Sequence, residues 1–153
     1  MFRLNRLTDY AVVVMTQMTH RPEEVHTAPQ IANDTGIPLP TVAKLLNALA
    51  RESLVVSHRG AAGGYTLGRS AEEISVAEII QVLEGPIALT ACVDGAEHRC
   101  DIETLCPMCG NWNKVNRAIQ QALEQVTLAE MLPGPVFPWS PEPGVADKRP
   151  ADA

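Results

Sequence analysis

Apolar residues recur every three or four positions in the first part of the chain, and this period predicts short amphipathic helices. The first is expected over Thr8–Met18, with Thr8 as its cap, and a second begins at the capping box Thr27–Gln30. A third covers about 40–52 and buries a stripe that consists of Val42, Leu45, Leu46 and Leu49. Gly36 lies between the second and third helices, and two short helices joined by such a turn are typical of a helix-turn-helix.

The pattern then changes to two short runs that fit β-strands. These runs, 54–58 and 65–67, flank the glycine-rich segment 60–64 and predict a β-hairpin. A hairpin directly after a helix-turn-helix forms a winged helix. Farther along, the capping box Ser75–Glu78 opens a helix that ends at about Glu84.

The last third of the chain predicts one longer helix and two segments without regular structure. The helix is expected over about 112–125, where the apolar residues at helical spacing are Trp112, Val115, Ile119, Ala122, Leu123 and Val126. Residues 92–110 have no period and predict a loop, and six prolines among the 21 residues of 133–153 predict a disordered tail. The expected fold is mainly α with a small β-hairpin wing, divided into a winged helix-turn-helix domain (1–70), a segment with the loop and long helix (71–132) and the tail (133–153).

Composition and charge change this picture in one respect. The 153 residues fit one globular domain with an appendage. We expect a cytoplasmic protein, with no transmembrane helix or signal peptide. The net charge of −6 taken alone argues against a nucleic-acid ligand. However, residues 1–70 hold seven basic and five acidic residues, whereas 71–153 hold five and thirteen. Segments charged +2 and −8 are expected to meet different partners.

The predicted winged helix offers several candidate contacts to double-stranded DNA. The first turn of a recognition helix meets base edges in the major groove, and here it carries Thr41 and Lys44. Arg59 at the slim wing tip suits a narrow minor groove. The glycines would admit phosphates, and Tyr65 either contacts a phosphate or packs beneath the wing. The candidates are Arg3, Thr41, Lys44, Arg59, Gly60, Gly63, Gly64 and Tyr65. The alternative is a set of small helices and a surface hairpin with no DNA function.

All four cysteines lie within one short stretch, as Cys92, Cys100, Cys106 and Cys109. In a reducing compartment such a group is more often metal-binding or redox-active than disulfide-bonded. Soft thiolates select zinc or an iron–sulfur cluster, and the spacing does not separate the two. A thiol oxidoreductase would place the Cys106/Cys109 pair between a strand and a helix, which this loop does not. With no hydrolytic constellation or phosphate loop either, we expect neither an enzyme nor a small-molecule substrate.

The whole arrangement resembles the Rrf2 family of bacterial winged-helix regulators, which includes IscR-like, NsrR-like and SufR-like iron–sulfur regulators. The resemblance spans about residues 2–132. It is carried by Thr8-Asp9-Tyr10-Ala11, the wing Arg59–Leu67, the helix after Ser75, the cysteines and Thr127–Glu130. It implies a DNA-binding repressor that forms a homodimer, in which the long helix over about 112–126 crosses to the partner.

The resemblance also implies a cofactor. Cys92, Cys100 and Cys106 match the family's three cluster cysteines, which implies an iron–sulfur cluster, 2Fe–2S in preference to 4Fe–4S, with zinc as the alternative. Cys109 stands where IscR-like members have histidine, and this departure favours a regulator of iron–sulfur assembly genes. Asp9 matches a position that supplies a ligand from the other subunit in NsrR-like members, a role that Cys109 makes less needed. Nitric oxide or iron are the alternative signals.

Overall fold

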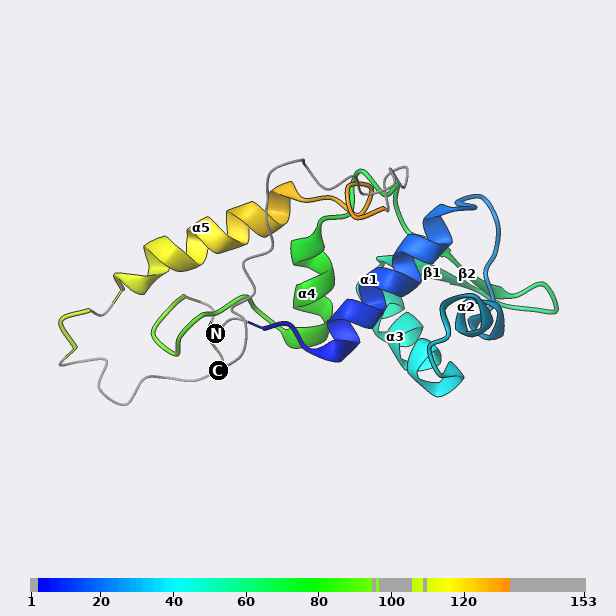
Figure 1. The fold of residues 1–153 in the computed structure, drawn as a ribbon, viewed down its shortest axis with the longest axis horizontal. Helices are drawn as coiled ribbons and strands as arrows, with labels where there is room; N and C mark the ends of the chain where they lie inside the picture. The colour runs from blue at the N-terminus through cyan, green and yellow to red at the C-terminus, as the bar shows by residue number, and fades with distance from the viewer. Residues whose placement is uncertain (1–2, 95, 97–105, 109, 133–153) are drawn as a thin grey trace, which may run out of the picture.

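The computed structural model describes residues 3–94, 96, 106–108 and 110–132. Its elements, in chain order, are α1 (Arg6–Thr19), α2 (Ala28–Thr35), α3 (Leu39–Arg51), β1 (Val55–His58), β2 (Gly64–Leu67), α4 (Val76–Glu84) and α5 (Trp112–Gln125). Figure 1 shows α2, α3 and the hairpin at one end of the molecule, α1 and α4 in the middle, and α5 extending away at the other end. No helix among the described residues is long and apolar enough to cross a membrane.

The helix-turn-helix and its wing form as the sequence predicts. The Thr27 hydroxyl accepts from the Gln30 amide at 3.3 Å, and the Thr27 amide donates to the Gln30 side chain at 2.9 Å, so the capping box that opens α2 is confirmed. β1 pairs with β2 in antiparallel register from Val55↔Leu67 to His58↔Gly64. The fold is therefore a winged helix.

The start of α1 differs from the prediction. Its N-cap is Asn5, whose side chain accepts from the Leu7 amide at 2.6 Å, so the helix begins at Arg6. The prediction of Thr8 as the cap was wrong because Thr8 is completely buried and lies inside the helix. Its hydroxyl instead donates to the carboxylate of Glu84, the last residue of α4, at 2.5 Å.

α4 packs into two hydrophobic clusters and so connects the winged helix with α5. The main core, formed largely by α1 and α3, also contains Ile74, Ile79 and Leu128. A smaller cluster joins α4 to Leu4 and α5, and consists of Val76, Ala77, Ile80 and Ile87 with Leu4, Leu123 and Val126 packed against them. The core of the winged helix thus continues past residue 70, and the division of the chain at that point stays a prediction.

Candidate nucleic-acid interface and cysteine loop

The exposed face of α3 carries the polar side chains of the recognition helix. The buried stripe of α3 turns toward the core, and Lys44, Asn47 and Arg51 lie exposed on the opposite side. Thr41, in the first turn, is half-buried. Asn47 and Arg51 were missed in the sequence analysis, although the helical period that places Lys44 outward also places residues three and seven positions later outward. The face can therefore present a cation and an amide side by side to DNA.

A contact between Tyr65 and Asn47 joins the wing to the recognition helix. The Tyr65 hydroxyl and Asn47 Oδ1 are 3.4 Å apart, and the Tyr65 ring packs against the main core. The backbone of Tyr65 also exchanges two hydrogen bonds of 2.8 Å with His26, just before α2. Tyr65 therefore packs at the base of the wing, and its contact with a phosphate stays a prediction.

The wing tip presents Arg59 on a turn that depends on glycine. Arg59 is exposed, and within the described residues no ion pair involves it. Gly60 has a φ of +105°, and its carbonyl accepts from the Gly63 amide at 3.0 Å. A Cβ on Gly63 would lie 2.6 Å from the His58 carbonyl oxygen, and Gly64 is packed as tightly. The turn requires glycine at positions 60 and 63, and close packing against the His26 carbonyl requires it at position 64. The approach of these glycines to phosphates stays a prediction.

Arg3 is not brought beside the wing. It is exposed and precedes Leu4, which packs in the smaller cluster beside α4 and α5. Figure 1 shows this N-terminal segment beside α4, on the far side of α1 from the hairpin. Any contact of Arg3 with DNA would therefore use a surface separate from the wing.

Two of the four candidate metal ligands lie in the described part of the chain. Cys92 and Cys106 are half-buried and carry free thiols. Cys100 and Cys109 lie outside the described residues, and no group of three or more metal-ligating side chains occurs within them. The Thr90 hydroxyl oxygen is 3.2 Å from Cys92 Sγ. Partly exposed cysteine thiols of this kind can serve as ligands to a soft metal ion.

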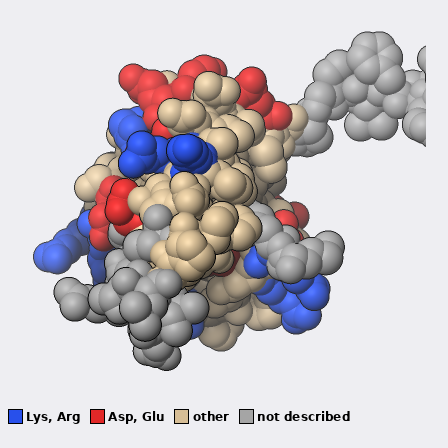
Figure 2. All heavy atoms as spheres, turned by 90° about the vertical axis from the view of Figure 1, so that its left-hand side faces the viewer, with Lys and Arg blue, Asp and Glu red and all other residues tan. Residues whose placement is uncertain are grey.

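The apolar stripe of α5 is divided between the core and the surface. Leu123 packs in the smaller cluster, whereas Trp112 and Val115 in the first turns are 41% and 44% exposed. Asn116 is the only residue of α5 that is fully buried among those described. Figure 2 faces the end from which α5 extends, and uncharged side chains occupy the middle of this face, with charged groups around them. Trp112 and Val115 thus place exposed apolar side chains on a protruding helix, an arrangement that occurs at interaction surfaces.

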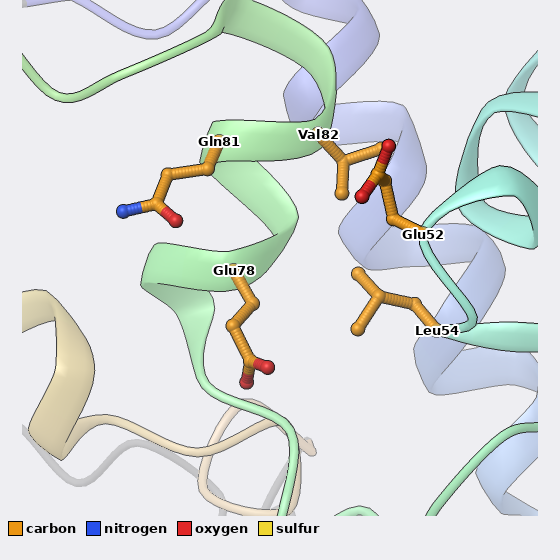
Figure 3. A pocket seen from close by; sticks show the side chains of 5 residues that line it. All are labelled: Glu52, Leu54, Glu78, Gln81 and Val82. Atoms are coloured by element: carbon orange, nitrogen blue, oxygen red, sulfur yellow. The ribbon is translucent and has the colours of Figure 1, made fainter.

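A pocket of about 390 Å³ lies between α4 and the segment that joins α3 to β1. Glu52, Leu54, Glu78, Gln81 and Val82 line it, and Figure 3 shows the first two approaching from the side of α3 and the other three from α4. The Glu78 carboxylate is already bound by the Ser75 amide at 2.9 Å and by Arg69 at 2.6 Å. The described part of the chain places none of the predicted DNA contacts, and neither Cys92 nor Cys106, in the lining of this pocket.

Comparison with known proteins agrees with this geometry. The model of the Rrf2 family, described as iron-dependent transcriptional regulators, matches residues 4–134. The regulator IscR of Serratia proteamaculans is 32% identical over 135 residues, 85% of this chain and 79% of that protein. The solved structure of T. potens IscR has a TM-score of 0.63 at 29% identity and covers 85% of each chain. That of CymR, the global cysteine regulator of B. subtilis, has a TM-score of 0.65 at 25% identity over 86% of this chain and 96% of that one.

Proposed function

Because the chain belongs to the Rrf2 family of transcriptional regulators, whose members bind DNA and are not enzymes, we propose that an iron–sulfur cluster on its cysteine loop controls its binding to DNA. In this proposal the protein is a cytoplasmic homodimer that represses genes of iron–sulfur cluster assembly. The cluster-loaded and cluster-free forms bind one operator with different affinities, because the cluster binds one arrangement of the dimer better than the other.

The contact between Tyr65 and Asn47 is the observation that supports the DNA part of the proposal most directly. Asn47 lies one helical turn after Lys44, so this contact holds the base of the wing beside the polar face of α3. Lys44 and Thr41 would then meet the major groove while Arg59 at the wing tip meets the minor groove. Gly60, Gly63 and Gly64 keep the tip slim enough to enter that groove.

The chemistry of the donor set supports the cluster. The cysteines Cys92, Cys100, Cys106 and Cys109 would hold it, and thiolate-bound iron supplies a redox-sensitive centre. When Cys92 is a thiolate, its sulfur can only accept, so the hydroxyl of Thr90 at 3.2 Å becomes the donor. A hydrogen bond to a ligating sulfur raises the reduction potential of a bound cluster.

The exposed part of α5 supports the dimer. A second copy of α5 would cover Trp112 and Val115, which a monomer leaves in water. Dimerisation also places two winged helices on one operator, and this compensates for the modest positive charge of each. The cysteine loop adjoins α5, so a change in the loop would alter the spacing of the two wings.

The decisive experiment is purification without oxygen followed by analysis of iron, sulfide and zinc. The proposal predicts a brown protein with iron and acid-labile sulfide. The affinity for a promoter duplex should then differ between the loaded and the metal-free protein at one fixed salt concentration. A colourless protein with stoichiometric zinc would show that the cysteines hold a structural zinc ion and not a cluster. Equal affinity of the two forms would contradict regulation by the cluster.

A further inference from the structure

The segment that carries Cys92 is tied to α5 by the side chain of Asn116. This segment, residues 87–94, is called the Cys92 arm below. Asn116 is 5% exposed, and its Nδ2 donates to the Ile87 carbonyl at 2.8 Å. Its Oδ1 accepts from the Leu89 amide at 2.9 Å. One buried amide therefore pairs with the backbone of the Cys92 arm through both of its ends.

A second asparagine ties the arm beyond the cysteine. The Asp94 amide donates to Asn113 Oδ1 at 2.9 Å. Asn113 and Asn116 are three residues apart, so they lie on the same face of α5. The ion pair between Arg117 and Asp94, at 3.6 Å, is exposed on both sides and adds little. The arm is thus bound to α5 both before and after Cys92.

Asn116 occupies a buried position of α5, where an amphipathic helix usually has an apolar residue. A buried side-chain amide is tolerated in a protein interior only when both its donor and its acceptor are hydrogen-bonded. Leaving such a group without partners costs more free energy than the intact hydrogen bonds contribute to stability. The arm is irregular, so its backbone groups need partners from outside the arm. Asn116 meets both requirements at once, and the position of the arm therefore depends on α5.

We infer that Asn116, assisted by Asn113, is a positioning residue that holds Cys92 against α5 before any metal centre binds. The position of Cys92 is then fixed in advance by the hydrogen bonds between its segment and α5. Through these bonds a shift of the Cys92 arm would also move α5. This last consequence rests on the proposed function, whereas the placement of Cys92 does not.

The test uses the full-length, metal-free protein. Amide hydrogen exchange should accelerate about tenfold at Leu89 in Asn116→Leu and at Asp94 in Asn113→Ala, because each variant loses the local bonds that protect that amide. Alkylation of Cys92, followed by peptide mass spectrometry, should become several-fold faster in Asn116→Leu, while Cys106 changes less than twofold. Asn111→Ala is the matched control, since Asn111 is the N-cap residue of the same helix and makes no capping hydrogen bond with its side chain.

Two results would overturn the inference. The first is an unchanged alkylation rate at Cys92 in Asn116→Leu although the Leu89 amide has become exposed. The second is an equal acceleration at Cys92 and Cys106, which would indicate general loosening of the fold. If Asn116→Leu does not fold, Asn113→Ala decides the question, because it removes one bond from a half-exposed residue. A smaller acceleration confined to Cys92 is then expected, and an unchanged rate at Cys92 rejects the inference.

Reconstitution with ferrous iron and sulfide separates this inference from the proposed function. If the wild-type protein takes up iron and sulfide, Asn116→Leu should change the visible circular dichroism of the bound centre and Asn111→Ala should not. If the wild-type protein takes up neither, the proposed function fails, and the exchange and alkylation results still decide whether α5 positions Cys92.

Discussion

The hydroxyl of Thr8 donates to the carboxylate of Glu84 across 2.5 Å, which joins the first turn of α1 to the last residue of α4. The same carboxylate oxygen accepts from the Asn5 amide at 2.9 Å, at the N-cap of α1. A carboxylate at this end of a helix also interacts favourably with the helix dipole. Glu84 is followed directly by the segment that leads into the Cys92 arm. The start of the winged helix is thus fastened to the end of the helix that precedes the cysteine loop.

Replacing Thr8 by valine tests this connection. The variant keeps the buried volume but loses the hydroxyl, so the free energy of unfolding should fall by about 1 kcal/mol. Urea denaturation followed by far-ultraviolet circular dichroism measures the change. Thr16→Val is the control, because among the described residues the Thr16 hydroxyl bonds only to the Val13 carbonyl of its own helix, at 2.9 Å, and its effect should stay within about 0.5 kcal/mol. Equal effects of the two substitutions would mean that the bond to Glu84 adds no stability.

The carboxylate of Glu78 should make stability depend on acid pH. Burial acts to raise the pKa of Glu78, but the hydrogen bond from the Ser75 amide, with those from Arg69 and the Ser75 hydroxyl, outweighs it and holds the pKa below its usual value. A group whose pKa is lower in the folded state stabilises the protein above its unfolded pKa, and this contribution is lost as the pH falls through the folded pKa. Glu78→Gln should therefore cost about 0.5 kcal/mol at pH 7, and progressively less in acid.

Denaturant unfolding of wild type and Glu78→Gln, repeated from pH 7 down into the acid range, measures the difference in free energy of unfolding. Glu72→Gln serves as the control, because Glu72 is exposed and no side-chain hydrogen bond of its own is found within the described chain. A difference between wild type and Glu78→Gln that stays constant with pH would show that the carboxylate has the same pKa in both states.

Removing the guanidinium of Arg59 should weaken DNA binding about tenfold on a duplex with a narrow, A·T-rich minor groove, and less on a G·C-rich one. Fluorescence anisotropy at one stated salt concentration measures both affinities. Arg117→Ala provides the control, since Arg117 belongs to α5, which extends away from the end of the molecule that carries the wing (Figure 1). The same loss on both duplexes would assign Arg59 to a phosphate contact, and no loss would remove the wing tip from the interface.

A charge on the exposed face of α5 should prevent dimerisation. Val115→Glu places a carboxylate in the apolar area that a second copy would bury, so we expect a monomer in sedimentation velocity experiments and a loss of affinity for a two-site operator. Val56→Glu is the matched control for the sedimentation measurement alone, because Val56 on β1 is also 44% exposed but lies on the wing, away from α5. If Val115→Glu remains a dimer, the interface lies elsewhere.

The local elements and their order along the chain follow from the sequence alone. The capping boxes at Thr27 and Ser75 and the buried stripe of α3 all depend on residues three or four positions apart, and such signals act within a single turn of helix. The hairpin after α3 is local in the same sense. The winged helix could therefore be predicted, together with an outward-facing Lys44.

Which face of each element is covered follows only from the folded arrangement, because burial depends on residues far apart in the chain. The sequence predicts Thr8 as a helix cap, yet in the fold its hydroxyl donates a hydrogen bond to Glu84, and Asn5 caps the helix instead. Asn116 reads as one polar residue among many on α5, and only the fold brings the Cys92 arm over it. The spacing of apolar residues within one segment is enough to predict a helix. The hydrogen-bond partner of a buried polar group, in contrast, can come from a segment far away in the sequence.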